Sequence, residues 1–298
     1  MVGQKWRQGV LAPYVFLAPA VVLMLVFVYI PIVESFRYSL YDWNSFTPEW
    51  EWVGLGNYEK LLQDQLFWKS ILNNIWYAVI SVAIQVFFAL VLAAMLESGA
   101  ISRRLATFFR TAIFLPAVLA VTIVGITWQM LFRPDTGLIN QLLTTIGLPS
   151  LARAWLGEES TAMFAIIGVS QWQWLGYTMI LFIVAIRGTP RDLYEAARID
   201  GANAIQQFWH VTVPSVRETT LVLATITVIG AFMVFDIVWV MTAGGPNHAS
   251  EVLGSYLYRT AFRDDAMGYA STIASMLFLI TLSLTFVQLR LGRTGKDA

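Results

Sequence analysis

Cysteine is absent from this chain, and histidine occurs only at His210 and His248. The composition therefore excludes disulfides and thiolate metal sites. The two histidines belong to segments that we expect on opposite sides of a membrane, so we expect no metal site.

Charged residues are scarce as well. They make up 13% of the 298 residues, hydrophobic residues make up 57%, and the mean hydropathy is +0.64. These values lie outside the range usual for soluble domains and are typical of membrane proteins. The formal net charge of zero gives no indication of a nucleic-acid partner.

A phosphate-binding loop of the form G-x4-G-K-S/T is also missing. Gly295-Lys296 is followed by Asp297 and has no first glycine at the required distance. The sequence contains no metal-ligand cluster and no nucleophile-base arrangement. We therefore expect no catalytic residues, no bound cofactor and no ATPase activity in this chain.

Six apolar runs are long enough to cross a hydrocarbon core, which takes about 20 helical residues. Asp236 is the only Asp, Glu, Lys or Arg within them. Because lone strands are not stable in lipid, we expect an all-α integral membrane fold in a single domain over residues 1–298. We interpret the first run as a signal anchor rather than a cleavable signal peptide. The expected helices are approximately 13–33, 75–96, 111–132, 162–186, 219–241 and 267–289.

The basic residues predict the orientation. With a cytoplasmic N-terminus, the inner segments hold 12 of the 19 Lys and Arg residues, although the outer segments are longer. Acidic residues have the opposite distribution, with 12 of the 19 Asp and Glu residues in the outer segments. We therefore expect both termini and the loop 187–218 in the cytoplasm.

The loop 187–218 has the pattern of two short helices. Thr189 can cap a first helix that starts at Pro190, with Asp192 near the acidic position of a capping box. Asp200-Gly201 would end this helix. Asn203 can start a second helix that presents three apolar residues together and is stopped by Pro214. The three apolar residues are Ile205, Phe208 and Trp209.

This loop resembles a family motif. Glu195-Ala196-Ala197, Gly201 and then Val211-Thr212-Val213-Pro214 follow the EAA-x3-G-x9-I-x-L-P loop of ABC importer permeases, with Val at the Ile and Leu positions. In that family the loop is the coupling helix, which sits in a cleft of the ATPase subunit, so we call residues 187–218 the coupling loop. The resemblance implies that ATP and Mg are bound by partner subunits. The implied coupling residues are Glu195, Ala196, Ala197, Asp200, Gly201, Ala202, Phe208, Trp209 and Pro214.

A second resemblance concerns the substrate. The later segments look like the F-D-x4-(L/M)-T-x-G-G-P…Y-x-x-A-F stretch of carbohydrate-uptake permeases, on the side of the maltose transporter's first permease subunit. These segments are Phe235-Asp236, Met241–Pro246, Leu253, Tyr258 and Ala261-Phe262. Early landmarks of the same group match Pro31, Ser35, Ser39-Leu40 and Gly54–Tyr58. The chain departs from the maltose subunit in lacking a large periplasmic insertion, and Thr189 stands where the group often has Ile.

A polar and aromatic cluster lies deep in the fourth expected helix. It begins about 14 Å from the outer end, at about 1.5 Å per residue. Sugars require hydrogen-bonding groups together with flat apolar faces, so this cluster is a candidate pathway; packing between helices would account for any one of its residues equally well. Its residues are Gln171, Trp172, Gln173, Trp174 and Tyr177.

Further pathway candidates lie in the fifth expected helix. Thr227 and Phe232 fall near the family's sugar-lining region. Asp236 is only about 7 Å from the expected helix end, where hydration or a bond to the Gly244-Gly245 turn favours a structural role. Gln85 is a further polar residue at depth, for which helix packing is favoured.

The resemblances together imply a permease subunit of a type I ABC sugar importer in a bacterial inner membrane. Such a subunit pairs with a second homologous permease, docks two ATP-binding cassette subunits and receives a di- or oligosaccharide or glycosyl polyol from an extracytoplasmic binding protein. One alternative is an ABC permease for glycerophosphate-type solutes. Another is an ion- or proton-coupled secondary carrier, which predicts more buried charge and leaves the coupling loop unexplained.

Overall fold

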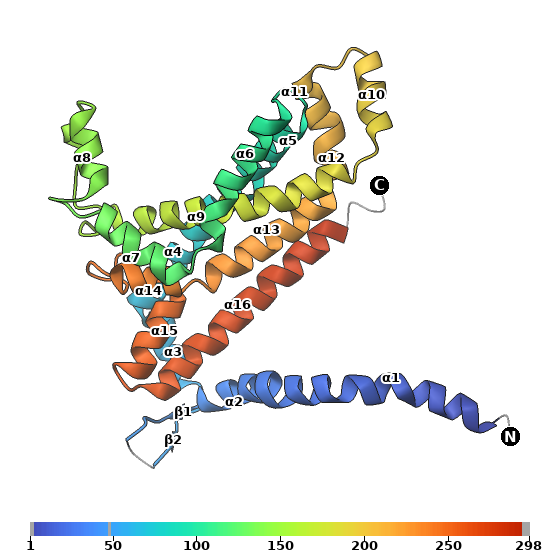
Figure 1. Ribbon diagram of the computed structural model, residues 1–298. Coiled ribbons are helices and arrows are strands. Elements are labelled where there is room, and N and C mark those ends of the chain that lie inside the picture. The colour runs from blue at the N-terminus through green and yellow to red at the C-terminus, as the bar shows by residue number, and fades with distance from the viewer. Residues whose placement is uncertain (1–2, 47–48, 294–298) are drawn as a thin grey trace. The chain divides into compact units, whose positions relative to one another are not determined.

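The computed structural model describes residues 3–46 and 49–293, which belong to two compact units (Figure 1). Unit 1 contains the chain up to Asp64 together with Leu257–Leu279, and unit 2 contains Gln65–Tyr256 and the residues from Ile280 onward. We describe each unit separately. Helices α15 (Leu253–Phe262) and α16 (Met267–Arg293) contribute residues to both units.

Unit 1 begins with a long apolar helix. It is built from α1 (Gly3–Met24), the π-helical segment η1 (Leu25–Tyr29) and α2 (Ile30–Tyr38). A two-stranded antiparallel ribbon follows, β1 (Tyr41–Asp42) with β2 (Glu51–Trp52), and then α3 (Gly56–Gln63). Asn57 of α3 is buried and donates hydrogen bonds to the carbonyls of Ser39 and Tyr41, both at 3.0 Å. The Gly54–Tyr58 landmark thus fixes the start of α3 against the end of α2.

Unit 2 contains the remaining helices. Residues 65–97 form α4 (Gln65–Ser81), the π-helical η2 (Val82–Phe88) and α5 (Ala89–Glu97). Residues 103–151 form α6 (Arg103–Phe114), the 3-10 segment η3 (Leu115–Val118), α7 (Val121–Leu131), α8 (Leu138–Thr145) and η4 (Pro149–Leu151). Residues 162–242 form α9 (Ala162–Arg187), α10 (Arg191–Ile199), α11 (Ala204–Gln207), η5 (Phe208–Thr212), α12 (Val213–Ser215), α13 (Arg217–Phe232) and α14 (Asp236–Thr242).

The apolar core of unit 2 lies where α9 packs against α5, η2 and α6. Ala89 and Ala93 of α5 are buried together with Met179 and Phe182 of α9. Gly176 permits the close approach of α6, because a Cβ atom there would lie 2.0 Å from the carbonyl oxygen of Ile113. Small residues at helix contacts are typical of packing inside membranes.

The third expected helix, 111–132, is bent rather than straight. Helix α6 ends at Phe114, and the axes of the two halves, Arg103–Val118 and Val121–Leu131, differ by 100°. Pro116 has no backbone N–H to continue the hydrogen-bond ladder. The Gln173 side chain of α9 donates a 3.0 Å hydrogen bond to the carbonyl of Leu119, so the break is supported by a residue distant in sequence.

The fifth expected helix, 219–241, is also interrupted. Helix α13 ends at Phe232, and α14 begins at Asp236. The fully buried Asn74 side chain donates to the carbonyls of Ala231 and Phe232, at 2.7 and 3.4 Å, and accepts from the N–H of Leu253 at 2.9 Å. The two carbonyls are backbone groups that an uninterrupted helix would pair within itself.

The break changes the position expected for Asp236. The side chain is exposed in the first turn of α14, where a negative charge is favourable to the helix dipole, instead of lying inside a continuous span. The carboxylate that lies against the glycine turn is that of Glu251, which is fully buried. A Cβ atom on Gly244 would come within 2.6 Å of both Glu251 carboxylate oxygens.

The described residues confirm an all-α membrane fold. Four helices are long and apolar enough to cross a membrane: Pro13–Tyr38, Gln65–Glu97, Ala162–Arg187 and Met267–Gln288. Two bent pairs satisfy the same test when each pair is one span, which gives up to six spans. The second pair joins Ala204–Ser215 to Arg217–Phe232 at 73°, so the end of the coupling loop is continuous with the fifth span.

Candidate functional site

The first helix of the coupling loop, α10, projects beyond the end of α9 (Figure 1). Its N-cap is Pro190 and Thr189 is buried before it, so the expected Thr189 cap is wrong by one position. None of the residues of α10 is buried. The sequence therefore builds a helix that is largely exposed, with only Tyr194 and Ala197 half-buried.

The turn after α10 is a Schellman motif. Gly201 lies at φ +81°, and its N–H donates to the carbonyl of Arg198 at 3.0 Å. The N–H of Ala202 donates to the carbonyl of Ala197 at 2.9 Å, which completes the two characteristic bonds. A left-handed residue at this position favours glycine, since a side chain costs about 1–2 kcal/mol there. The predicted helix end at Asp200-Gly201 is confirmed.

The second helix of the coupling loop starts as predicted at Asn203. Its side chain accepts from the N–H of Gln206 at 2.9 Å, and the Gln206 side chain accepts from the N–H of Asn203 at 2.8 Å. The two helices are joined by a 3.1 Å hydrogen bond between the hydroxyls of Tyr194 and Thr212. Pro214 is exposed within α12, the last turn before α13.

The apolar residues of the coupling loop divide into two groups. Ile199 and Ile205 are 86% and 70% exposed beside the Gly201 turn. Phe208 instead is half-buried and packs against the buried core cluster of unit 2, so less of its surface remains for the expected contact with an ATPase cleft. Trp209 is 51% exposed, and its ring centroid lies 6.4 Å from that of Phe87. Phe87 is about 15 Å along its helix from Glu97, at about 1.5 Å per residue, so Trp209 lies beside an apolar span.

Ile199 was missed as a site residue by the sequence analysis. The available signal was a large apolar side chain at the last position of the helix, directly before Asp200-Gly201. The preceding motif residues of α10 are Glu195 and Ala196, which are exposed, and Ala197, which is half-buried. The turn also borders a surface hollow of about 230 Å³, lined by Ala197, Asp200, Gly201, Ala202, Gln206, His210 and Val211.

An ion-pair group lies at the base of the coupling loop. Glu97, the last residue of α5, accepts from Arg110 of α6 at 2.5 Å and from Arg187 of α9 at 3.1 Å. Arg110 also donates to the carbonyl of Leu96 at 3.1 Å. One carboxylate therefore joins α5, α6 and α9 at Arg187, the first residue of the loop. Sequence analysis missed this group because its members are far apart in the chain.

The two glutamines of the deep cluster are buried between helices. Gln171 donates to the hydroxyl of Ser81 at 3.0 Å and accepts from Gln85 at 2.8 Å. Gln173 donates to the carbonyl of Leu119. Of the two interpretations left open by the sequence, packing between helices describes the arrangement of these two side chains.

The aromatic residues of the deep cluster face outward from unit 2. Trp172, Trp174 and Tyr177 are exposed, and the Trp174 and Tyr177 rings meet edge to face at 6.2 Å between centroids. Thr227 of α13 is half-buried, and Phe232 is buried at the end of that helix. Among the pathway candidates in α9, the aromatic rings are therefore accessible and the amides are not.

Comparison with known proteins identifies the family. Residues 85–294 match the family described as binding-protein-dependent transport system inner membrane component. The chain belongs to this family. It is 50% identical over 291 residues to a probable ABC transporter permease protein, YurN of Bacillus subtilis (strain 168), covering 98% of this chain and 99% of the relative.

A relative with a named substrate and a solved structure add to this comparison. The chain is 33% identical over 281 residues to the arabinooligosaccharides transport system permease protein AraP of Halalkalibacterium halodurans, covering 94% of this chain and 87% of the relative. A chain from the crystal structure of a bacterial ABC transporter involved in alginate import superposes with a TM-score of 0.85 at 22% identity. The superposition covers 98% of this chain and 99% of that one. This likeness confirms the ABC importer permease fold.

Proposed function

We propose that this chain is the saccharide-translocating permease subunit of a binding-protein-dependent ABC importer. The observation that carries the proposal is the coupling loop. Its motif residues form a largely exposed helix that ends in a left-handed glycine turn, with exposed isoleucines on either side. A loop that only connected two membrane spans would not require such a projecting structure.

Two observations support a saccharide as the substrate. The AraP relative is named for arabinooligosaccharides, and the similarity extends over almost the whole of both chains. The exposed Trp172, Trp174 and Tyr177 supply the flat faces on which sugar rings stack. The chain itself performs no covalent chemistry.

The proposed assembly is that of the ABC importers whose permeases the chain resembles. This permease pairs with a second homologous permease, docks two ATP-binding cassette subunits that hold ATP and Mg, and receives the saccharide from an extracytoplasmic binding protein. Both termini and the coupling loop lie in the cytoplasm, in agreement with the distribution of Lys and Arg. Closure of the ATPase dimer moves the coupling loop, and the attached spans change the accessible side of the pathway.

The experiment compares the purified chain with the co-expressed assembly in nanodiscs and proteoliposomes. We expect no ATP hydrolysis by the chain alone. The assembly should hydrolyse ATP and import at least one of arabinotriose, maltotriose and lactose when the binding protein is supplied. Robust hydrolysis by the isolated chain would contradict the proposal, as would import of glycerol 3-phosphate without import of any saccharide.

A further inference from the structure

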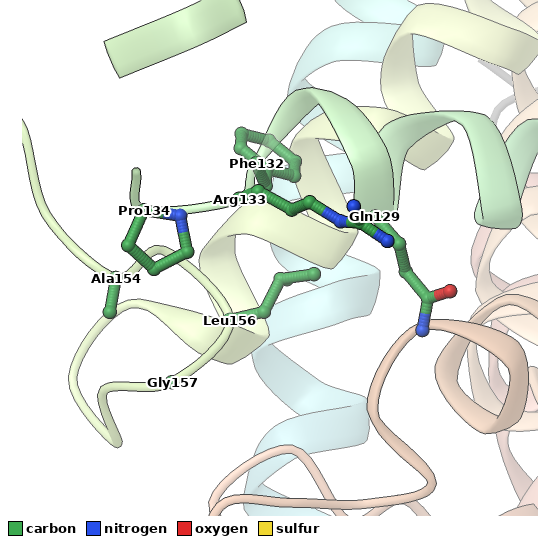
Figure 2. A pocket seen from close by; sticks show the side chains of 7 residues that line it. All are labelled: Gln129, Phe132, Arg133, Pro134, Ala154, Leu156 and Gly157. Atoms are coloured by element: carbon green, nitrogen blue, oxygen red, sulfur yellow. The ribbon is translucent and has the colours of Figure 1, made fainter. Parts of the chain in front are cut away.

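A hollow of about 360 Å³ lies where α7 ends, beside the segment that leads into α9 (Figure 2). Its size is at the lower end of the range of about 300–1,000 Å³ usual for small-molecule sites. In the proposed orientation it opens on the outer side of the membrane. The lining residues are Gln129, Phe132, Arg133, Pro134, Ala154, Leu156 and Gly157.

The hollow offers one strong hydrogen-bond donor. Arg133 is exposed, and no described residue forms an ion pair with it. Figure 2 shows its side chain extending toward Gln129. A guanidinium presents several N–H groups in a fixed plane and suits a ligand with neighbouring oxygen atoms.

Gln129 offers an acceptor in the same hollow. Its Nε2 donates to the carbonyls of Val240 and Met241, at 2.8 and 2.9 Å. Carbonyl oxygens only accept, so the amide nitrogen must face them and the amide oxygen is left for a ligand. Phe132 and Leu156 add apolar surface beside these two polar groups.

A series of aromatic rings leads inward from the hollow. The ring centroids of Phe132 and Trp128 are 5.3 Å apart, and those of Trp128 and Trp172 are 5.5 Å apart. Trp155 lies on the other side of Phe132, at 6.1 Å. Trp172 belongs to the deep cluster of α9, so the rings connect the hollow with the depth at which the pathway aromatics lie.

We propose that this hollow is an outer saccharide subsite of the permease. One sugar ring places its apolar face on Phe132 and Leu156, its neighbouring hydroxyls accept from Arg133, and another hydroxyl donates to the amide oxygen of Gln129. The aromatic series then provides successive stacking surfaces toward the deep cluster. This inference rests on the proposed function and names a binding site for its substrate.

An acidic side chain of the docked binding protein is the competing occupant. A carboxylate would satisfy Arg133, but it accepts only and would face the amide oxygen of Gln129 with no proton to donate. A sugar hydroxyl both donates and accepts. The combination of donor, acceptor and apolar wall therefore favours the sugar.

The test uses the nanodisc assembly and two variants of this chain. Arg133→Gln removes the positive charge and the planar guanidinium with its five N–H donors, and Ala154→Trp places a bulky ring in the hollow. Arg153→Gln is the matched control, because it removes a positive charge from the same outer segment at a residue that does not line the hollow. The probes are arabinotriose, maltotriose and lactose, and the sugar imported by the wild-type assembly is used for binding.

Two quantities are measured for each variant. Saturation-transfer NMR without the binding protein reports sugar binding to the assembly, and a titration with labelled binding protein reports docking. We expect each of the two hollow variants to weaken sugar binding at least about tenfold, the scale for losing a charged hydrogen bond. Docking of the binding protein and the Arg153→Gln control should stay close to wild type.

Four results would overturn the inference. Unchanged sugar binding in both hollow variants would show that no sugar lies there. Weakened docking with unchanged sugar binding would assign the hollow to the binding protein. A wild-type assembly that imports saccharide but shows no binding in the absence of the binding protein would refute the subsite and leave the proposed function intact. Failure to import any saccharide would overturn both proposals.

Discussion

Ile199 is expected to be the principal apolar anchor for the ATPase subunit. It is 86% exposed at the C-terminal end of α10, next to the left-handed Gly201. Phe208, in contrast, already packs in the core of unit 2, and Trp209 is half covered. Substituting Ile199 by Ala removes apolar surface from the tip without disturbing a contact within unit 2.

The size of the effect follows from the exposed surface. Complete burial of an isoleucine side chain contributes about 1.5–3 kcal/mol. Since most of Ile199 is still exposed in the free chain, nearly all of this remains to be gained on docking. Alanine keeps only the first side-chain carbon, so we expect a loss of about 1–2 kcal/mol, or about five- to thirtyfold in Kd. Glu195→Gln should cost about 1 kcal/mol or less, as exposed ion pairs do.

The assay is titration of the permease pair in nanodiscs with labelled ATPase subunit, for wild type, Ile199→Ala and Glu195→Gln. Ile226→Ala serves as the control, because Ile226 is also an exposed isoleucine but lies on the span α13. Sugar-stimulated ATPase activity is measured in parallel. Wild-type affinity in Ile199→Ala, or an equal loss in Ile226→Ala, would refute the reasoning.

Three further predictions concern the turn, the deep cluster and the loop base. Gly201→Ala should insert normally, because the space around its Cβ position is open, but the strain of about 1–2 kcal/mol at φ +81° should lower sugar-stimulated ATPase activity. Gly201→Asn should retain more of this activity. Equal activity in the two variants would argue against the backbone explanation. Trp174→Ala should reduce saccharide uptake and leave the thermal stability of the assembly unchanged. Gln171→Leu should lower the Tm of the assembly, because it leaves buried hydrogen-bond partners unsatisfied at about 1–3 kcal/mol each. The reverse pattern would indicate that Gln171, and not Trp174, contacts the saccharide. Glu97→Gln should destabilise the assembly more than Arg187→Gln, since Glu97 forms ion pairs with two arginines and the Arg187 side chain is 57% exposed. A lower Tm for Arg187→Gln than for Glu97→Gln in thermal unfolding would contradict this account of the loop base.

Local interactions explain why much of the coupling loop could be predicted from sequence. The glycine turn and the Asn203 capping box each join residues no more than five positions apart. Their geometry is therefore contained in a short stretch of sequence. The apolar runs likewise predict an all-α membrane fold, because lipid leaves backbone groups no partner outside a helix.

Tertiary contacts support the breaks in two of the expected spans, in one case together with the local effect of Pro116. The end of α13 is stabilised by Asn74, and the bend before α7 is supported by Gln173. Each amide lies more than 50 residues along the chain from the carbonyl to which it donates. The local sequence around either residue therefore does not predict these hydrogen bonds.

The same reason explains which residues of the candidate site are covered by neighbouring helices. Sequence gives helical spacing, and spacing shows which side chains share a face but not which neighbour covers that face. Phe208 is covered by the core of unit 2 and Gln171 by Ser81 and Gln85, while Ile199 is left uncovered. The amino-acid sequence thus determined the membrane fold, the family motif and the turn, because these depend on hydropathy and local hydrogen bonds. The packing of distant helices decided which of the predicted residues remain accessible to a partner or a sugar.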